Sequence, residues 1–127
     1  MYNNGYNVYK NNSVNYASKE QLLLMLVEGA VKFSKRAELN LNEKDINKAH
    51  ENLLKTQNII AELMSTLDTS VGDWAVQLFK VYRFIYDKLV EANIKKDIKI
   101  LKEILPLIEE VNNLWHETYD LAKKQGN

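Results

Sequence analysis

The chain has 127 residues, enough for one domain with one hydrophobic core. Its 17 lysines and arginines balance 17 aspartates and glutamates, and a formal charge of zero argues against nucleic-acid binding. The absence of cysteine excludes disulfides, thiolate metal sites and thiol catalysis, and it is compatible with a reducing compartment.

Residues 1–17 are predicted to form an extended N-terminal arm. They are polar and rich in asparagine, and Tyr6, Tyr9 and Tyr16 recur in them without helical periodicity. These tyrosines could stack on a ligand, but docking of the arm on apolar surface, with the hydroxyls left in water, is the simpler interpretation. The arm could shield a binding surface until a partner displaces it, or it could clamp a bound partner. We favour the shielding hypothesis.

Residues 18–127 are predicted to form the folded domain. Ser18 as the N-cap, with Gln21 completing a capping box, predicts a helix over Lys19–Leu41. Apolar periodicity between polar turns predicts three further helices over Asp45–Leu67, Asp73–Asn93 and Ile98–Lys124. Pro106 removes one backbone hydrogen bond and should bend the last helix. Four helices with short connections predict an all-α protein, an antiparallel up-and-down four-helix bundle.

One apolar stripe on each helix is predicted to form the core, because its residues recur at helical spacing. The stripes contain Leu22, Leu26, Ala30, Phe33 and Ala37; Ile46, Leu53, Ile60, Met64 and Leu67; Leu78, Tyr82, Ile85 and Leu89; and Ile98, Leu101, Leu105, Ile108 and Trp115. Trp74, like Trp115, is expected to pack in the core or in a groove rather than to hold a cofactor.

Further apolar residues lie beside these stripes on every helix. On the last helix, Ile100, Leu107, Leu114 and Leu121 recur every seven residues along one edge. A wide core stripe is the simpler interpretation for any single residue. For four helices together, we favour a partner-binding groove or a dimer face. The candidate partner-binding residues are Leu24, Val27, Val31, Ile59, Leu63, Val81, Phe84, Leu107 and Leu114.

The sequence contains no pattern that indicates catalysis or a metal site. Both histidines, His50 and His116, have asparagine three residues earlier, where a di-iron bundle needs glutamate. His50 is expected to be a hydrogen-bonded structural residue near the core. The longest apolar run, Leu22–Val27, is far shorter than the ~20 residues that cross a bilayer, and no signal peptide is apparent. We therefore expect a cytoplasmic protein that is not an enzyme, with no cofactor, no metal and no membrane insertion.

Several segments, taken in order, resemble the FliS flagellar export chaperones over nearly the whole chain. They are Tyr6, Tyr9 and Asn12-Ser13-Val14 in the arm, Leu24-Met25-Leu26 with Gly29-Ala30, Gln57-Asn58-Ile59-Ile60, Glu62-Leu63-Met64-Ser65-Thr66-Leu67-Asp68, Leu89-Val90-Glu91-Ala92-Asn93-Ile94-Lys95 with Asp97, and Trp115. The chain departs from the family pattern at Lys19, where the family has proline, at Val27-Glu28, where it has Tyr-Asp, and at Pro106.

The resemblance implies a function. Such chaperones bind the disordered C-terminal segment of flagellin in the cytosol, prevent its polymerisation and present it to the flagellar type III export gate. The implied partners are therefore this segment and, once it is bound, a component of the gate, with the chaperone a monomer or weak homodimer. A homodimeric adaptor without a client, with its extra apolar stripes buried in self-association, is the alternative.

Overall fold

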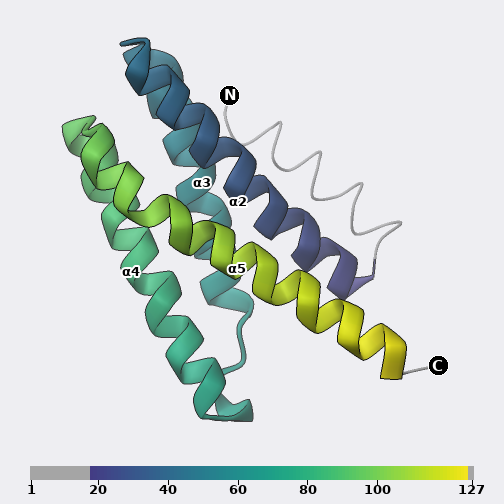
Figure 1. Cartoon of the computed structure of the whole chain (residues 1–127). Helices are drawn as coiled ribbons and strands as arrows, with labels where there is room; N and C mark the ends of the chain where they lie inside the picture. The colour runs from purple at the N-terminus through teal and green to yellow at the C-terminus, as the bar shows by residue number, and fades with distance from the viewer. Residues whose placement is uncertain (1–17, 126–127) are drawn as a thin grey trace.

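The computed structural model describes residues 18–125, and within this range it contains four long α-helices, one short 3-10 helix and no β-strand. The elements are α2 (Lys19–Asn42), α3 (Ile46–Thr66), η1 (Thr69–Val71), α4 (Asp73–Lys95) and α5 (Ile98–Gln125). Each long helix runs antiparallel to the one before it (Figure 1). The predicted all-α four-helix bundle is confirmed, and every predicted helix boundary lies within two residues of the observed one.

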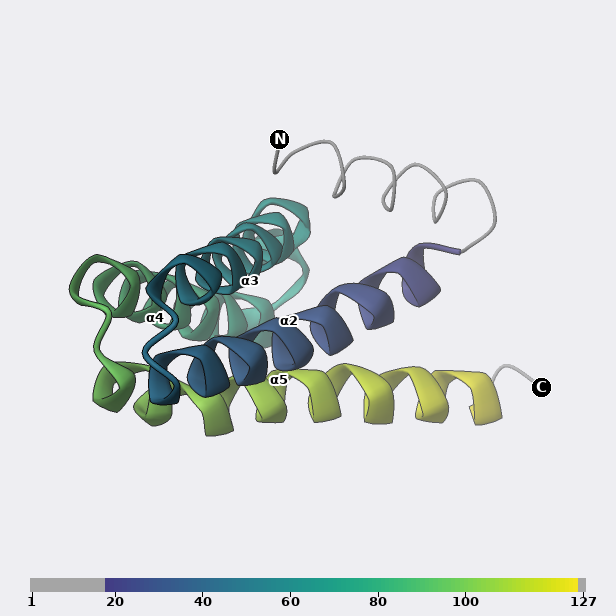
Figure 2. The ribbon, with the colours of Figure 1, turned by 90° about the horizontal axis from the view of Figure 1, so that it is seen from above.

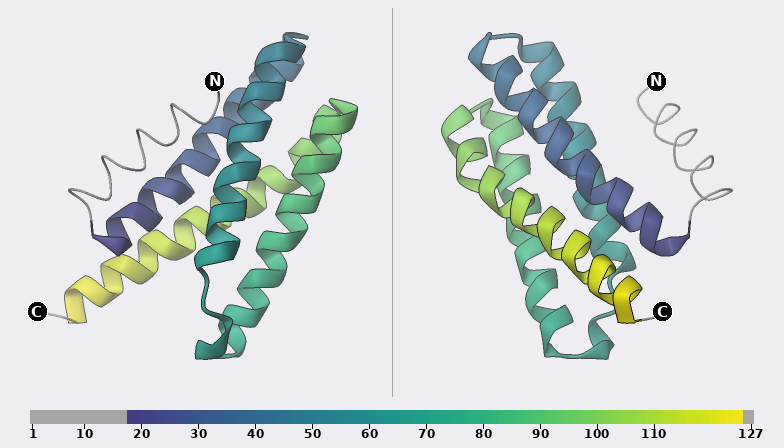
Figure 3. Two further views of the ribbon diagram at one scale, coloured as in Figure 1. Left: turned by 180° about the vertical axis from the view of Figure 1, so that it is seen from behind. Right: turned by 45° about the vertical axis from the view of Figure 1, so that its right-hand side comes forward.

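The four helices pack in a ring that follows chain order. α2 packs against α3 and α5, and α4 packs against the same two helices. Figure 2 shows that the α2–α5 pair is inclined to the α3–α4 pair, and both views in Figure 3 show the two pairs diverging at one end. We call this end, with the start of α4 and the last turns of α5, the open end. The closed end carries the α2–α3 and α4–α5 turns.

Local interactions fix where the helices begin and end. Ser18 and Gln21 form the predicted capping box: the Gln21 backbone N–H donates to Ser18 Oγ at 3.2 Å, and the Ser18 N–H donates to Gln21 Oε1 at 3.0 Å. Asp45 caps α3 through the Lys48 N–H. α4 continues past its predicted end and stops at Lys96, which has a left-handed backbone with φ of 50°. α5 is continuous through Pro106, and the expected bend there stays a prediction.

The core includes residues from all four helices, and in α5 it extends only from Leu101 to Val111. Most residues of the predicted stripes are buried or half-buried, and the largest fully buried side chains include Leu53, Ile60 and Tyr82. Ile46 is the exception, because it occupies the first turn of α3 at the tip of the molecule, and its side chain is exposed. Each full burial of a large aliphatic side chain stabilises the fold by roughly 1.5–3 kcal/mol.

The closed end is joined by side-chain amides. The Asn93 side chain is buried, and its Nδ2 donates to Gln57 Oε1 at 2.8 Å. His50 Nδ1 lies 2.9 Å from Asn93 Oδ1 and 3.4 Å from Lys96 Nζ. His50 is hydrogen-bonded as predicted, but its ring is exposed rather than close to the core. The side-chain amides of Asn40 and Asn52 join α2 to α3 at 2.7 Å.

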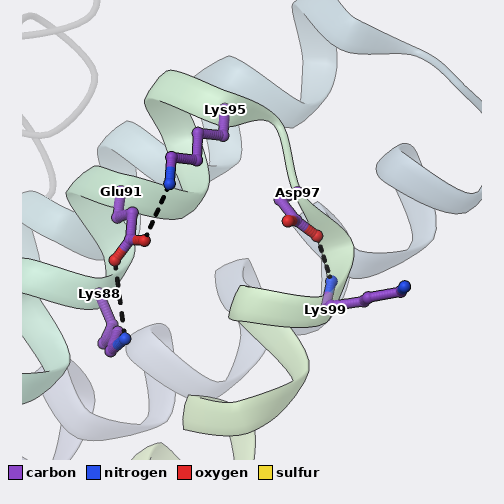
Figure 4. A network of polar contacts seen from close by, with 5 residues as sticks. All are labelled: Lys88, Glu91, Lys95, Asp97 and Lys99. Atoms are coloured by element: carbon purple, nitrogen blue, oxygen red, sulfur yellow. Dashed lines mark hydrogen bonds and ion pairs between the residues drawn. The ribbon is translucent and has the colours of Figure 1, made fainter.

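Charged side chains surround the α4–α5 turn at this end (Figure 4). The Glu91 carboxylate lies 3.6 Å from Lys88 Nζ and 3.2 Å from Lys95 Nζ. The hydrogen bond from Lys95 and the positive charges of Lys88 and Lys95 lower the pKa of Glu91. Asp97 accepts from the Lys99 backbone N–H at 2.8 Å and so caps the start of α5.

Candidate partner-binding surface

An aromatic cluster connects α4 to α5 toward the open end. Trp115 Nε1 donates to Tyr82 Oη at 2.8 Å, which satisfies the hydroxyl of a tyrosine that is otherwise buried. Burial raises the pKa of Tyr82 to about 12, although the hydrogen bond from Trp115 acts in the opposite direction. Trp74 contacts the Trp115 ring edge-on, with 6.4 Å between centroids and 72° between planes, while its own side chain is 56% exposed. The cluster therefore extends from the core to the surface.

This cluster identifies the side of α4 that faces α5. Successive helical residues lie ~100° apart, so residues seven apart are nearly aligned. Val81 follows Trp74 by seven residues and shares this side, where its side chain is 37% exposed. Phe84 lies further outward on the same helix and is 48% exposed. α4 thus presents large apolar groups beside its contact with α5.

The matching side of α5 is identified by its ion pairs with α2. Glu109 pairs with Lys35 at 2.8 Å and His116 with Glu28 at 3.1 Å, which places α2 along one edge of α5. Leu107 and Leu114 lie on the opposite edge, toward α4. Leu107 is half-buried against the core and Leu114 is 44% exposed. We call Trp74, Val81, Phe84, Leu107 and Leu114 the α4–α5 surface.

Four of the nine predicted partner-binding residues, Val81, Phe84, Leu107 and Leu114, therefore border one face of the molecule. Leu24 and Val31 are half-buried against the core, as Leu107 is, but they belong to α2 and so lie outside the α4–α5 surface. Trp74 also belongs to the surface, which agrees with the groove alternative predicted for it, but it was not included among the nine candidate residues. Its spacing of seven residues from Val81 is the signal in the sequence that could have identified it.

Three of the nine predictions are wrong about exposure. Val27 is 0% exposed, Ile59 3% and Leu63 1%, so these side chains belong to the core. The physical reason is that α2 and α3 share the most extensive helix–helix contact of the bundle, which covers residues beside their core stripes. α2 and α3 also approach closely: a Cβ added to Gly29 would lie 3.1 Å from Ile59 Cδ1. The arm tyrosines Tyr6, Tyr9 and Tyr16 lie outside the described residues.

The α4–α5 surface offers apolar contact rather than reactive groups. Within residues 18–125, no three histidine, cysteine or acidic side chains are grouped so that they could hold a metal ion. No helix in the same range is long and apolar enough to span a bilayer. Exposed tryptophan, phenylalanine and leucine side chains on two neighbouring helices are typical of a protein-binding surface. The fold and the surface together define a helical protein-binding module.

Comparison with known proteins identifies its family. The family described as "Flagellar protein FliS" matches residues 2–122. The chain is 35% identical to the flagellar secretion chaperone FliS of Bacillus subtilis over 95% of this chain and 90% of that protein. It is 32% identical to the FliS chaperone of Salmonella typhimurium over 86% and 82% of the two chains, and 29% identical to that of Campylobacter jejuni over 94% and 95%. The chain belongs to the FliS family. It is therefore a chaperone of flagellar secretion and not an enzyme.

Proposed function

We propose that this chaperone binds the disordered C-terminal segment of flagellin in the cytoplasm, prevents its premature polymerisation and delivers it to the flagellar type III export apparatus. The observation that supports this proposal is the α4–α5 surface, which leaves large apolar side chains exposed on a chain of the FliS family. An amphipathic segment can lay its apolar face on such a surface. The same apolar face then becomes inaccessible for self-assembly.

The energetics of such a complex favour a preformed surface on the chaperone. A disordered segment loses conformational entropy when it folds on its partner, so a large contact area is needed to offset that cost. Trp74 is held by Trp115, and Trp115 is held by its hydrogen bond to Tyr82. The anchoring rings are thus ordered before binding, which lowers the entropy lost on association.

The test is a pair of substitutions on one helix. Val81 and Val76 are both on α4, and their side chains are 37% and 38% exposed, but they lie on different sides of the helix. Val81→Ala should weaken binding of a flagellin C-terminal peptide in isothermal titration calorimetry, and Val76→Ala should leave it unchanged. Phe84→Ala should weaken it by ~1–3 kcal/mol, the range for an anchoring interface residue.

These variants also test the assignment of the surface. Phe84 is about half exposed, so its removal should change the free energy of unfolding only slightly. If Phe84→Ala unfolds the protein while affinity per folded molecule is unchanged, Phe84 belongs to the core. If both valine substitutions weaken binding equally, the client does not select the α4–α5 surface.

The same exposed side chains are compatible with a homodimeric adaptor that has no client. Analytical ultracentrifugation over a concentration series, with and without the flagellin peptide, separates the two hypotheses. A chaperone gives a complex with the peptide at concentrations where the free protein is a monomer or weak homodimer. An adaptor gives a dimer that persists on dilution and does not respond to the peptide.

A further inference from the structure

A row of three carboxylates runs beside the leucines of α5. Glu103, Glu110 and Glu117 recur every seven residues. Each stands four residues before a leucine of the edge described above, namely Leu107, Leu114 and Leu121. Seven residues fall only about 20° short of two full helical turns, so both rows stay on one edge of α5. Over the 14 residues between Leu107 and Leu121 the rows extend for about 21 Å.

All three glutamates are exposed and available to a partner. Within residues 18–125, none of them has an ion-pair or hydrogen-bond partner. The opposite edge of α5 differs, because Glu109 there is paired with Lys35 of α2. The acidic row is therefore a property of the edge that carries the α4–α5 surface, in a chain whose formal charge is zero.

The two rows together are the pattern by which one helix selects another. In helix pairs with a seven-residue repeat, the apolar seam supplies affinity, and the charges that flank it choose the partner and its register. A matching partner places cations opposite these glutamates, whereas an acidic partner is repelled. Because the repeat is seven, the partner must lie along α5 at a small crossing angle, near 20°, rather than across it.

We infer that the α5 edge of the surface binds an amphipathic helix whose apolar stripe is flanked by lysine or arginine. This rests on the proposed function in one respect: the natural occupant would be a helix formed by the exported client. The α4 border has a different character, since Lys88 lies 5.9 Å from the Phe84 ring centroid and 3.6 Å from Glu91. The preference for a positively charged partner therefore comes from α5 alone. It determines which side of the bound helix faces α5.

The experiment uses two designed helical peptides of about three heptads with identical leucine stripes. One has lysine at the flanking positions and the other has glutamate. Fluorescence anisotropy with the full chain should show the lysine peptide binding at least about tenfold more tightly, the combined effect of several exposed charge pairs. This preference should shrink as salt is raised, because the Debye length falls to about 3 Å at 1 M.

A triple variant and a charge-matched control test the row itself. Changing Glu103, Glu110 and Glu117 to lysine should reverse the preference, so that the glutamate peptide binds more tightly. Changing Glu20, Glu43 and Glu51 to lysine alters the net charge equally, on exposed residues of α2, the α2–α3 turn and α3, and should leave the preference intact. If the triple variant does not fold, Glu110→Gln should still reduce the difference in affinity between the lysine peptide and the glutamate peptide.

Three results would overturn the inference. They are equal binding of the two peptides, absence of binding by both, and a reversal produced by the control variant as well. A flagellin C-terminal peptide, titrated against the same proteins, tests the proposed function separately. Flagellin binding without discrimination between the designed peptides rejects only the charged-helix inference. A lysine preference without flagellin binding rejects only the proposed function.

Discussion

The two ends of the bundle are built from side chains of different size. At the closed end, Ala37, Ala49 and Ala92 are fully buried where the helices meet. At the open end Ala75 is fully buried too, but the much larger Trp74 and Trp115 are in edge-on contact there and link α4 to α5. Because the distance between packed helices depends on the side chains at the contact, alanines allow a close approach and tryptophans hold the helices apart. The comparison shows how one bundle can be closed at one end and present apolar surface toward the other.

The polar contacts differ in the same way. At the closed end Gln57, Asn93 and His50 make directional hydrogen bonds around a buried amide. Toward the open end, the bond from Trp115 to Tyr82 joins α4 to α5. Buried amides are costly to leave without partners, so they fix how the helices meet. The aromatic cluster instead joins the core to an exposed ring.

The largest effect is expected in the core near the closed end. Leu53 is 0% exposed, so Leu53→Ala should leave a cavity that close-packed neighbours fill only in part. We expect the free energy of unfolding to fall by ~2–5 kcal/mol, measured by urea denaturation. A loss below ~1 kcal/mol would mean that this end is loosely packed and would remove the contrast between the ends.

The burial of Tyr82 toward the open end should make the stability of the fold depend on pH. The pKa of Tyr82 is about 12 in the folded protein and near 10 in the unfolded chain. The unfolded state therefore loses its proton first, and the contribution of Tyr82 to stability is present below pH 10 and lost as the pH rises to about 12. A difference of about two pKa units corresponds to at most ~3 kcal/mol of stability.

Tyr82→Phe isolates this contribution from other groups that titrate at high pH. At pH 7 the variant should be less stable by ~1 kcal/mol, because Trp115 Nε1 loses its acceptor. Between pH 10 and 12 its melting temperature should fall less than that of the parent protein. Parallel curves for the two proteins would show that Tyr82 ionises equally in the folded and unfolded states.

Enlarging a buried alanine near the closed end should destabilise the protein more than enlarging an exposed alanine near the open end. Ala49→Leu places three more carbon atoms where α3 has no free space, and we expect a loss of ~1–3 kcal/mol. Ala122→Leu makes the same change on an exposed position of α5 and should alter stability by less than ~0.5 kcal/mol. Thermal melts of both variants make the comparison. Equal losses would contradict the role assigned to the buried alanines.

Local features of the fold were predictable from sequence, because the interactions that determine them lie close together in the chain. The capping box of Ser18 and Gln21 is complete within four residues, and the helical periodicity of the core stripes is set within each helix. The left-handed residue that ends α4 is Lys96 rather than a glycine, so the sequence contains no clear signal for this helix end, which was predicted at Asn93.

The candidate surface was only partly predictable, because exposure depends on which helices become neighbours. Val27 and Ile59 lie beside their stripes just as Val81 does, yet the first two are covered because α2 and α3 share the most extensive helix–helix contact. Trp74 is a large apolar residue of the kind expected in a core, yet its side chain is 56% exposed although its ring contacts Trp115 of α5. Helical periodicity determines on which side of its helix a residue lies. Only the packed structure determines whether another helix or solvent faces that side.

The smallest effect on stability is expected for Leu114→Ala, which repeats the Leu53→Ala change on the α4–α5 surface. Leu114 is 44% exposed, so much of its side chain is already in water and its removal leaves no closed cavity. The free energy of unfolding should change by less than ~0.5 kcal/mol in the same urea titration. Binding of the flagellin C-terminal peptide should nevertheless weaken, by ~1 kcal/mol or more if Leu114 is an anchor of the interface. A loss of stability equal to that of Leu53→Ala would place Leu114 in the core, and with it the row of leucines on which the α5 edge depends.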